Sequence, residues 1–246
     1  MKNIFRLFAA AICLLAFLAA GCGSDDSKSK DSKAPVKIGV TAGPHAEIMD
    51  NVKKLAAKEG LQVEVVEFSD YVTPNVSLYQ EEIFANSMQH APYLAATREK
   101  EPKFDLVEAF KTVNFPMAVY SKTLKKGDAI PDGAIIGIPN DPSNGGRALA
   151  ILESAKLLKL KDGVGVSATA KDIVGNPKNL QIIEIEAALL PRSMDDTDLS
   201  VINSNFAMEA QLNPVKDSLF TEPKESPYAN IVAIRKGDEK RPEIQK

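Results

Sequence analysis

The residues best suited to bind a small charged molecule lie between Asn140 and Arg147, in the run Asn-Asp-Pro-Ser-Asn-Gly-Gly-Arg. A short apolar segment, residues 135–138, precedes this run, and a second apolar segment begins at Ala148. The pattern predicts a strand, a tight turn and then the first turn of a helix. The N–H groups and the positive dipole end of such a helix attract an anion, and the fork of Arg147 can grip both oxygens of a carboxylate. We therefore expect this turn to bind a small carboxylic acid.

The sequence around this turn does not have the pattern of an active site. Ser143 and Ser204 are the serines nearest to the expected site, and His90 would have to act as the base for one of them. There is no Gly-x-Ser-x-Gly elbow and no cluster with metal-ligand spacing. An envelope esterase or amidase is therefore the weaker hypothesis. We expect a binding protein that is not an enzyme and that uses no metal or cofactor.

The N-terminus has the pattern of a secreted lipoprotein. Lys2 and Arg6 precede an uninterrupted apolar run of 14 residues, 7–20. This run has the length of a signal-peptide core and is shorter than the roughly 20 residues of a membrane span. Small residues then lead to Cys22, as in the bacterial lipobox, where the acylated cysteine becomes the mature N-terminus. We expect a signal peptide over residues 1–21 and a lipid such as palmitate on Cys22. An ordinary secretory signal is the alternative.

Composition limits the partners and the chemistry of the mature chain. Cleavage after residue 21 would leave 225 of the 246 residues and change the formal charge from −3 to −5, which argues against nucleic acid as a partner. Cys13 lies in the signal and Cys22 would carry lipid, so the body has no thiol for a disulfide, a metal or a nucleophile. Residues 23–34 contain no apolar residue larger than alanine and predict a flexible tether.

The rest of the chain alternates between β-branched and amphipathic segments. The expected strands are residues 36–40, 62–68, 113–120, 135–138, 180–185, 199–202 and 228–234. The expected helices are residues 44–59, 92–100, 147–158, 169–174, 187–194 and 206–212. This alternation favours parallel sheets covered by helices. Two lobes are the favoured arrangement, because ligand sites form at domain interfaces and at the carboxyl ends of parallel strands.

Several motifs resemble those of the NlpA family of lipoproteins. They are residues 69–72, 86–94, 139–149, 161–165, 184–188, 190–192, 198–207 and 217–228, and the match runs in order from about residue 36 to 235. The resemblance implies an α/β, two-lobed periplasmic-binding-protein fold with largely parallel sheets and a hinge. Residues 22–35 would be the lipidated cysteine and its tether. Lobe 1 would span residues 36–119 with 227–246 returning to it, and lobe 2 residues 120–226.

The same resemblance implies a function in transport. The chain would be a lipid-anchored receptor of an ABC importer, which captures a free amino acid by lobe closure and delivers it to a membrane permease. Methionine is the expected ligand. The protein would act as a monomer in the cell envelope, held at a membrane by its lipid and facing the periplasm or the cell exterior.

The resemblance also assigns roles to individual residues. In the family, the arginine that follows the turn pairs with the ligand's carboxylate, and two asparagines lie beside it; here these are Arg147, Asn140 and Asn144. Asn203 would help to hold the amino-acid backbone. The pocket for the ligand's side chain would be lined by Tyr71, Met88, His90 and Tyr93. Six of these residues also have a structural alternative: a salt bridge for Arg147, a turn for Asn140 and Asn203, and packing for Tyr71, His90 and Tyr93. His45 is expected at the surface, at the start of a helix.

Some residues depart from the family pattern and leave alternatives open. Met88 stands in place of a phenylalanine, and Phe115 and Phe206 stand in place of tyrosines. Such changes can alter ligand preference by roughly 1–3 kcal/mol, so a related amino acid or a short peptide is an alternative ligand. A decayed or truncated family member that acts as a surface antigen or adhesin is an alternative function.

The last residues also differ from the family, whose members continue through a further helix or two packed on the first lobe. Residues 242–246, Pro-Glu-Ile-Gln-Lys, resemble the first turn of that helix. Without the rest of it we expect an apolar groove open to water, and a loss of stability of roughly 25 cal/mol per Å² of apolar area left uncovered.

Overall fold

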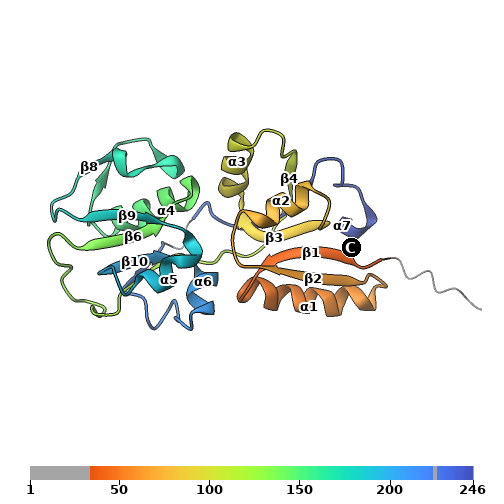
Figure 1. Ribbon diagram of the computed structural model, residues 1–246, viewed down its shortest axis with the longest axis horizontal. Helices are drawn as coiled ribbons and strands as arrows, with labels where there is room; N and C mark the ends of the chain where they lie inside the picture. Colours follow the sequence, from red (N-terminus) through yellow and green to blue (C-terminus); the bar gives the residue numbers. More distant parts are fainter. Residues whose placement is uncertain (1–33, 224–225, 246) are drawn as a thin grey trace, which may run out of the picture. The chain divides into compact units, whose positions relative to one another are not determined.

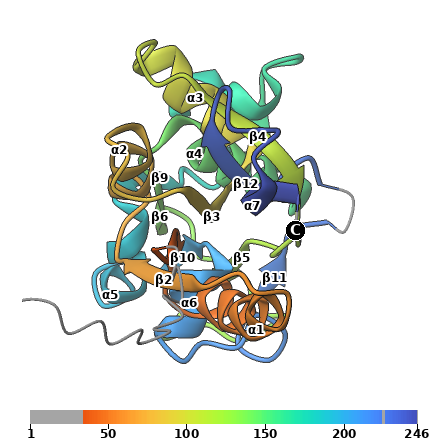
Figure 2. The ribbon, with the colours of Figure 1, turned by 90° about the vertical axis from the view of Figure 1, so that its right-hand side faces the viewer.

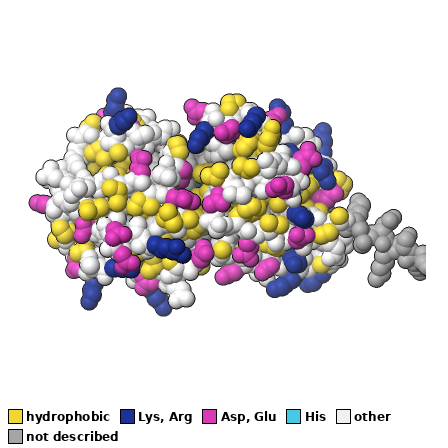
Figure 3. Space-filling model, in the orientation of Figure 1, with side chains coloured by type: hydrophobic (Ala, Val, Ile, Leu, Met, Phe, Trp, Pro, Cys, Tyr) yellow, Lys and Arg dark blue, Asp and Glu magenta, His cyan; other side chains and the backbone are white. Residues whose placement is uncertain are grey.

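The computed structural model describes residues 34–223 and 226–245, which form an α/β fold with two main sheets (Figure 1). The predictions for the signal peptide and Cys22, and for the tether as far as residue 33, lie outside the described residues. In the described part of the chain, none of the helices has the length and apolar character of a membrane span. Figure 3 shows charged side chains of both signs interspersed over the face in view.

The first sheet has four strands that run in one direction and one strand that is reversed. Its strands are Val36–Thr41 (β1), Val63–Phe68 (β2), Ala85–His90 (β3), Leu106–Lys111 (β4) and Asn230–Arg235 (β12). Their order is β2-β1-β3-β12-β4. β1 pairs in parallel with β2 and β3, whereas β12 pairs antiparallel with β3 and β4. Figure 2 shows β12 beside β3 and β4.

The second sheet repeats this arrangement with different strands. They are Ala118–Tyr120 (β5), Ile135–Pro139 (β6), Gln181–Ile185 (β9), Leu199–Ile202 (β10) and Phe220–Thr221 (β11). Their order is β11-β5-β10-β6-β9. β6 pairs in parallel with β9 and β10, whereas β5 pairs antiparallel with β10 and β11. Here β5 is the reversed strand.

Helices follow most of the strands. The first sheet carries Pro44–Lys58 (α1), Thr73–Tyr79 (α2) and Ala91–Lys100 (α3), and the second carries Pro142–Ser154 (α4), Leu190–Ser193 (α5) and Ser204–Glu209 (α6). A small hairpin consists of Lys159–Leu160 (β7) and Ile173–Gly175 (β8), and Pro242–Gln245 (α7) is the last element. Three short 3₁₀ turns cover Gly165–Ser167, Ala170–Asp172 and Ala187–Leu189.

The chain passes between the two sheets twice, and both reversed strands follow such a crossover. The first crossover, residues 112–117, joins β4 to β5, and the second, residues 222–229, joins β11 to β12. Because β12 is reversed, its first residue lies at the edge where β3 ends, and Asn230 is the register partner of His90. Polar residues from the carboxyl ends of β3, β6 and β10 and from the start of β12 are therefore available for one site.

Local sequence explains why α4 begins where it does. Asp141 is its N-cap and accepts a hydrogen bond from the backbone N–H of Asn144 at 2.9 Å, and Pro142 occupies the first helical position. Gly146 allows the first turn to approach the loop before Ala168, since a Cβ at Gly146 would lie 2.4 Å from the backbone oxygen of Val166. The strand, turn and helix expected around Asn140 are thus confirmed.

Several elements differ from the sequence expectation. The strand expected over residues 113–120 covers only β5, and residues 113–117 belong to the first crossover. The helix expected over residues 169–174 is a 3₁₀ turn followed by β8, and the one over residues 187–194 is a 3₁₀ turn followed by α5. The expectation also missed α2, β3 and β4. β3 was missed because Asn86 and Gln89 make it polar.

These polar residues of β3 can be buried because they bond to one another and to α2. The amide nitrogen of Asn86 donates to Asn75 Oδ1 at 2.9 Å, and that of Gln89 donates to the same oxygen and to Asn86 Oδ1, each at 2.7 Å. All six residues of β3 are buried. A strand with satisfied buried amides has no hydrophobic alternation, so periodicity cannot identify it.

An apolar groove with a cavity volume of about 470 Å³ lies on the first sheet. α1 lines it with Ile48, Val52 and Leu55, which are 42%, 39% and 60% exposed and lie on one face of the helix. Phe110 of β4 is 48% exposed and lines the groove as well. Ile244 of α7 packs against the buried residues Ala85, Val232 and Ile234 at this groove. The apolar groove expected from the sequence is thus present.

We predict that an amphipathic helix appended after Lys246 stabilises the protein, because it would cover the exposed apolar residues of α1 and β4. A gain of about 2 kcal/mol would raise the melting temperature by roughly 4–8 °C for a domain of this size. The measurement is thermal unfolding of the chain with and without the helix. The matched control is a helix of equal length with its apolar positions replaced by glutamine, which should give no increase. An equal effect of the two extensions would contradict the prediction.

Candidate functional site

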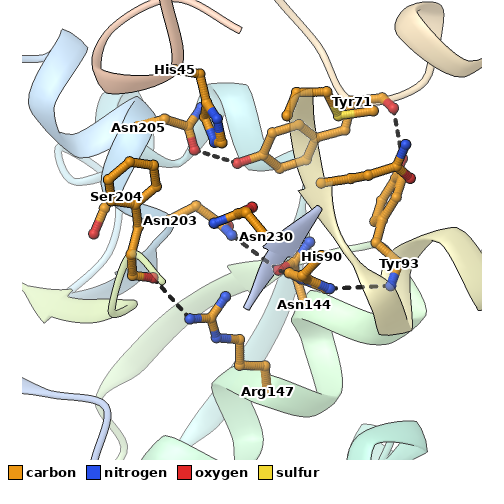
Figure 4. Close-up of a pocket in the computed structure, with 13 residues that line it drawn as sticks. His45, Tyr71, His90, Tyr93, Asn144, Arg147, Asn203, Ser204, Asn205 and Asn230 are labelled. Atoms are coloured by element: carbon orange, nitrogen blue, oxygen red, sulfur yellow. Dashed lines mark hydrogen bonds between the residues drawn. The ribbon is translucent and has the colours of Figure 1, made fainter. Parts of the chain in front are cut away.

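A small polar cavity lies where the carboxyl ends of β3 and β10 and the start of α4 meet the reversed strand β12 (Figure 4). Its lining is His45, Tyr71, Met88, Gln89, His90, Tyr93, Phe115, Asn144, Arg147, Asn203, Ser204, Asn205 and Asn230. The cavity volume is about 20 Å³, which is room for about one water molecule. The lining must therefore move apart before an amino acid can enter.

Of the eight ligand-binding residues expected from the sequence, the structure brings seven together here. Their assignment to ligand binding remains a prediction. The seven are Tyr71, Met88, His90, Tyr93, Asn144, Arg147 and Asn203. Asn140 does not line this cavity. It is exposed and lines a separate cavity of about 50 Å³ with Asp70, Asp141 and Glu186, and Tyr71 and Tyr93 line both cavities.

Arg147 is buried at the cavity and is only 3% exposed. Its Nε donates to Glu222 Oε1 at 2.9 Å and its Nη2 donates to Glu222 Oε2 at 2.5 Å. Nη2 also donates to the backbone oxygen of Phe115 at 3.0 Å, and the ring of Tyr228 lies 4.5 Å from the guanidinium carbon. The fork of Arg147 is therefore not free to grip both oxygens of a ligand's carboxylate, contrary to the expectation from the sequence. In the structure Glu222 takes its two parallel donors, and Figure 4 shows another guanidinium nitrogen pointing toward Asn203 and Asn230.

Asn144 and His90 form a hydrogen-bonded network that holds the site together. Nε2 of His90 lies 3.0 Å from Asn144 Oδ1, and Nδ1 of His90 accepts a hydrogen bond from the backbone N–H of Tyr93 at 3.1 Å. His90 therefore carries its proton on Nε2. Asn144 Oδ1 also accepts from Asn203 Nδ2 at 2.9 Å, and Asn144 Nδ2 donates to Asp141 at 2.9 Å. Asn144 thus orients its neighbours through every polar atom of its side chain.

Two buried amide atoms at the cavity have no hydrogen-bond partner among the described residues. They are Oδ1 of Asn203, an acceptor, and Nδ2 of Asn205, a donor. Asn203 is 7% and Asn205 4% exposed. Because an unpaired buried polar atom costs about 1–3 kcal/mol, such atoms indicate a missing partner. The site therefore offers one free acceptor and one free donor to a bound molecule.

Aromatic rings form one wall of the cavity. Tyr71 packs edge-on against Tyr93 with ring centroids 5.8 Å apart. It also packs against Phe206 at 4.8 Å, with the two rings tilted by 42°. The hydroxyl of Tyr71 donates to Asn205 Oδ1 at 2.5 Å, and that of Tyr93 donates to the backbone oxygen of Tyr71 at 3.0 Å. Burial raises the pKa of both phenols well above the usual value, so both stay neutral. The wall is apolar on its faces, and Met88 adds a buried thioether.

The expectation that His45 lies at the surface is wrong. His45 is 5% exposed, lines the cavity and contacts the ring of Phe115 edge-on at a centroid distance of 5.0 Å. Desolvation by burial lowers the pKa of His45 to about 4. His90 also has a pKa of about 4, chiefly through desolvation and against a smaller opposing effect of its bond to Asn144. Both imidazoles are therefore neutral near pH 7.

Sequence reasoning missed several other residues of the site. Asn205 lies two residues after Asn203, and Asn230 begins β12 and donates to the backbone oxygen of Val113 at 3.0 Å. Glu222 lies in a crossover with no local pattern around it. The only signal for Asn205 and Glu222 was their position inside the motifs at residues 198–207 and 217–228. Asn230 lies just outside the second motif.

The serines considered for hydrolysis have other partners. Ser143 Oγ donates to Asp141 Oδ1 at 2.9 Å, and Ser204 Oγ donates to the backbone oxygen of Pro116 at 2.5 Å. Both ring nitrogens of His90 are engaged elsewhere, as described above. In the described structure, His90 is therefore not arranged as a base for Ser143 or Ser204.

Comparisons of the sequence with known proteins agree on one family of lipoproteins. A family model described as NlpA lipoprotein matches residues 36–246. The D-methionine-binding lipoprotein MetQ of Salmonella typhimurium is 44% identical over 246 residues, which cover 98% of this chain and 89% of that protein. Outer membrane lipoprotein 2 of Mannheimia haemolytica is 42% identical over 216 residues, or 87% of this chain and 78% of that protein.

A solved structure of a nutrient-binding protein from Burkholderia cenocepacia bound to methionine matches with a TM-score of 0.82 and 44% identity, over 85% of this chain and 88% of that one. A periplasmic substrate-binding protein of an ABC transporter from Coxiella burnetii matches with the same TM-score, identity and coverage. These matches confirm the expected α/β periplasmic-binding-protein fold.

We predict that the two buried histidines make the protein less stable in acid. Their folded pKa of about 4 lies below the unfolded value of 6.5, so the unfolded chain binds more protons between these limits. This contribution to stability is complete above pH 6.5 and is lost as the pH falls toward 4. At pH 5 the two losses together are on the order of 4 kcal/mol.

The measurement is the free energy of unfolding by urea at pH 7 and pH 5. The double variant His45→Phe/His90→Gln serves as the control for the carboxylates, which titrate in the same range. The wild type should lose more stability than this variant, and equal losses would contradict the prediction. The sequence contains only these two histidines.

Proposed function

Because this chain belongs to the NlpA lipoprotein family, we propose that it is a substrate-binding protein of an ABC importer that captures a free amino acid. Methionine is the proposed ligand, since relatives at 44% identity are named or titled for methionine binding. The observation that carries the proposal is the pair of unpartnered amide atoms, Asn203 Oδ1 and Asn205 Nδ2, in a cavity that also contains Arg147. The proposed protein binds its ligand without chemical conversion.

The cavity has the donors and acceptors that a zwitterion requires. The ligand's carboxylate would contact the guanidinium nitrogen of Arg147 that points toward Asn203 and Asn230. The ammonium group would donate to Asn203 Oδ1, which has no partner. Amides suit this task because one side chain provides both a donor and an acceptor.

The aromatic wall suits a thioether side chain. Tyr71 and Tyr93 present ring faces and edges, and sulfur contacts with aromatic rings contribute roughly 0.3–1.5 kcal/mol. Met88 replaces the phenylalanine of the family pattern and gives the wall a flexible part. A related amino acid or a short peptide therefore stays the alternative ligand, and a surface antigen or adhesin stays the alternative function.

Binding requires that two lobes separate and close. The proposed lobes are residues 36–119 with 227–246, and residues 120–226. The membership of the strands in the two sheets supports this division, except that Ala118 and Val119 belong to β5 and therefore to the second sheet. The described residues of the two crossovers, 112–117, 222–223 and 226–229, would act as the hinge. The cavity of about 20 Å³ corresponds to a closed arrangement, which has to open to admit methionine.

The cellular setting of the proposal depends on the N-terminus. A lipid on Cys22 would hold the receptor at a membrane of the cell envelope, where a permease could receive its ligand. The proposed receptor is a monomer that faces the periplasm or the cell exterior. Relatives named as lipoproteins support this setting.

We predict that methionine binds and that Arg147→Ala weakens binding roughly 10- to 100-fold, because a hydrogen bond to a charged group is lost. The measurement is isothermal titration calorimetry with each of the twenty amino acids, on protein refolded to remove bound ligand. Arg98→Ala, which removes an exposed arginine of α3, is the control. No binding of methionine or its near relatives would refute the ligand assignment, and undiminished affinity would remove Arg147 from the site.

We also predict that Asn203→Ala weakens methionine binding roughly tenfold without disturbing the pair between Arg147 and Glu222. The variant removes the free acceptor that would receive the ligand's ammonium group. Asn51→Ala on the exposed face of α1 is the matched control. Equal affinities of the two variants, measured by the same titration, would mean that Asn203 does not contact the ligand.

A further inference from the structure

Glu222 is a carboxylate that contacts the cation of the site. Its two oxygens accept hydrogen bonds from Nε and Nη2 of Arg147 at 2.9 and 2.5 Å. The two side chains are 4% and 5% exposed, so water screens this pair very little. A bidentate pair of this kind fixes the plane of the guanidinium as well as its charge.

Both crossovers hold this ion pair in place. Glu222 is the first residue of the second crossover, and its oxygens also accept from Ser226 Oγ at 2.9 Å and from the backbone N–H of Met117 at 3.3 Å. Met117 is the last residue of the first crossover, whose Phe115 contributes the carbonyl bonded to Arg147 at 3.0 Å. The carboxylate of Glu222 is therefore held by residues of both crossovers as well as by Arg147.

The cavity contains no other formal charge. Arg147 is the single charged side chain among the described residues that line it, and the rest are amides, aromatic rings, Met88, Ser204 and the two histidines. Burial keeps His45 and His90 neutral, with a pKa of about 4 for each. Glu222, directly behind Arg147, neutralises the single charge of this lining. A further carboxylate, Asp141, lies outside the lining and accepts from Asn144 Nδ2 at 2.9 Å.

We propose that Glu222 determines the charge class of the ligand: by neutralising Arg147, it makes the cavity select net-neutral zwitterionic amino acids over simple organic anions. This inference rests on the proposed function, in which Arg147 contacts the ligand's carboxylate. Glu222 does not touch the ligand. It acts through Arg147 as a positioning and specificity-determining residue.

The physical reason lies in the balance of charges after binding. A carboxylate without an ammonium group would bring a net negative charge into a buried site whose cation is already paired, and a buried uncompensated charge is strongly unfavourable. A zwitterion brings its own cation, which can donate to the unpartnered Oδ1 of Asn203. If Glu222 is made neutral, the unpaired Arg147 should attract any small anion instead.

The wild-type protein provides the first test. Calorimetric titration should show binding of methionine and at least tenfold weaker binding of its desamino analogue, 4-(methylthio)butanoate. Methionine affinity should also change little when sodium chloride is raised, because the site is neutral. If methionine does not bind, the proposed function fails. If methionine and the analogue bind equally well, this inference fails and the proposed function stands.

The variant Glu222→Gln provides the second test, because glutamine keeps the shape of the side chain and removes its charge. The preference for methionine over the desamino analogue should fall roughly tenfold or more. Methionine affinity of this variant should also fall when sodium chloride is added, because chloride can bind to the unpaired Arg147. Sodium gluconate, whose anion is larger, serves as the comparison salt. A purely structural role of Glu222 would weaken both ligands equally and would leave the chloride response flat.

Two further variants complete the design. Glu153→Gln removes a carboxylate from the same helix as Arg147, where it bonds to the backbone N–H of Leu160 outside the cavity, and it should behave as the wild type. Glu222→Asp keeps the charge and should keep the preference for the zwitterion even if overall affinity falls. A folded Glu222→Gln protein with wild-type preference and wild-type chloride response overturns the inference. If Glu222→Gln does not fold, the inference is tested by the ligand preference of Glu222→Asp and by the titrations of the wild-type protein. Loss of the preference for the zwitterion in either protein would overturn it.

Discussion

The site depends on how the protein keeps one guanidinium group away from water. Arg147 is 3% exposed, and taking a cation out of water costs several kcal/mol unless an anion and hydrogen bonds offset the loss. Glu222, the carbonyl of Phe115 and the ring of Tyr228 supply these contacts. Because those partners come from both crossovers, the cation can be buried only when the two sheets are connected as they are. Burial of Arg147 therefore requires both the residues of the binding site and the two crossovers between the sheets.

The topology explains why the remaining polar groups converge on this cation. The reversed strand β12 brings Asn230 beside His90 at the carboxyl edge of the first sheet. The carboxyl ends of β6 and β10 lead to the turn before α4 and to Asn203 in the second sheet. Neither sheet alone contains a complete site. The carboxyl edges of both sheets face the same cavity, so short polar side chains from either sheet can reach a ligand there. The apolar core of each sheet is not interrupted by these side chains.

The parts of the site that could be predicted from the sequence have local causes. The turn before α4 is specified by Asp141 as N-cap and by Pro142, and both features are visible in the sequence. Burial of His45 is different, because it arises from packing against Phe115, seventy positions away along the chain. Glu222 pairs with Arg147 over a similar separation and lies in an irregular segment. Such contacts leave no periodic pattern, so only a resemblance between whole sequences could have suggested them.

Hydrogen bonds between elements of the two sheets close the cavity. His90 at the end of β3 bonds to Asn144 of α4, and Tyr71 after β2 bonds to Asn205 of α6. A ligand can favour the closed form only by what it adds to these contacts. The partners still missing are those of Asn203 Oδ1 and Asn205 Nδ2. If each unpaired atom costs about 1–3 kcal/mol, a molecule that satisfies both would shift the equilibrium toward closure by a factor of roughly 30 or more. The two unpaired amides are thus sufficient to couple occupancy of the cavity to its closure.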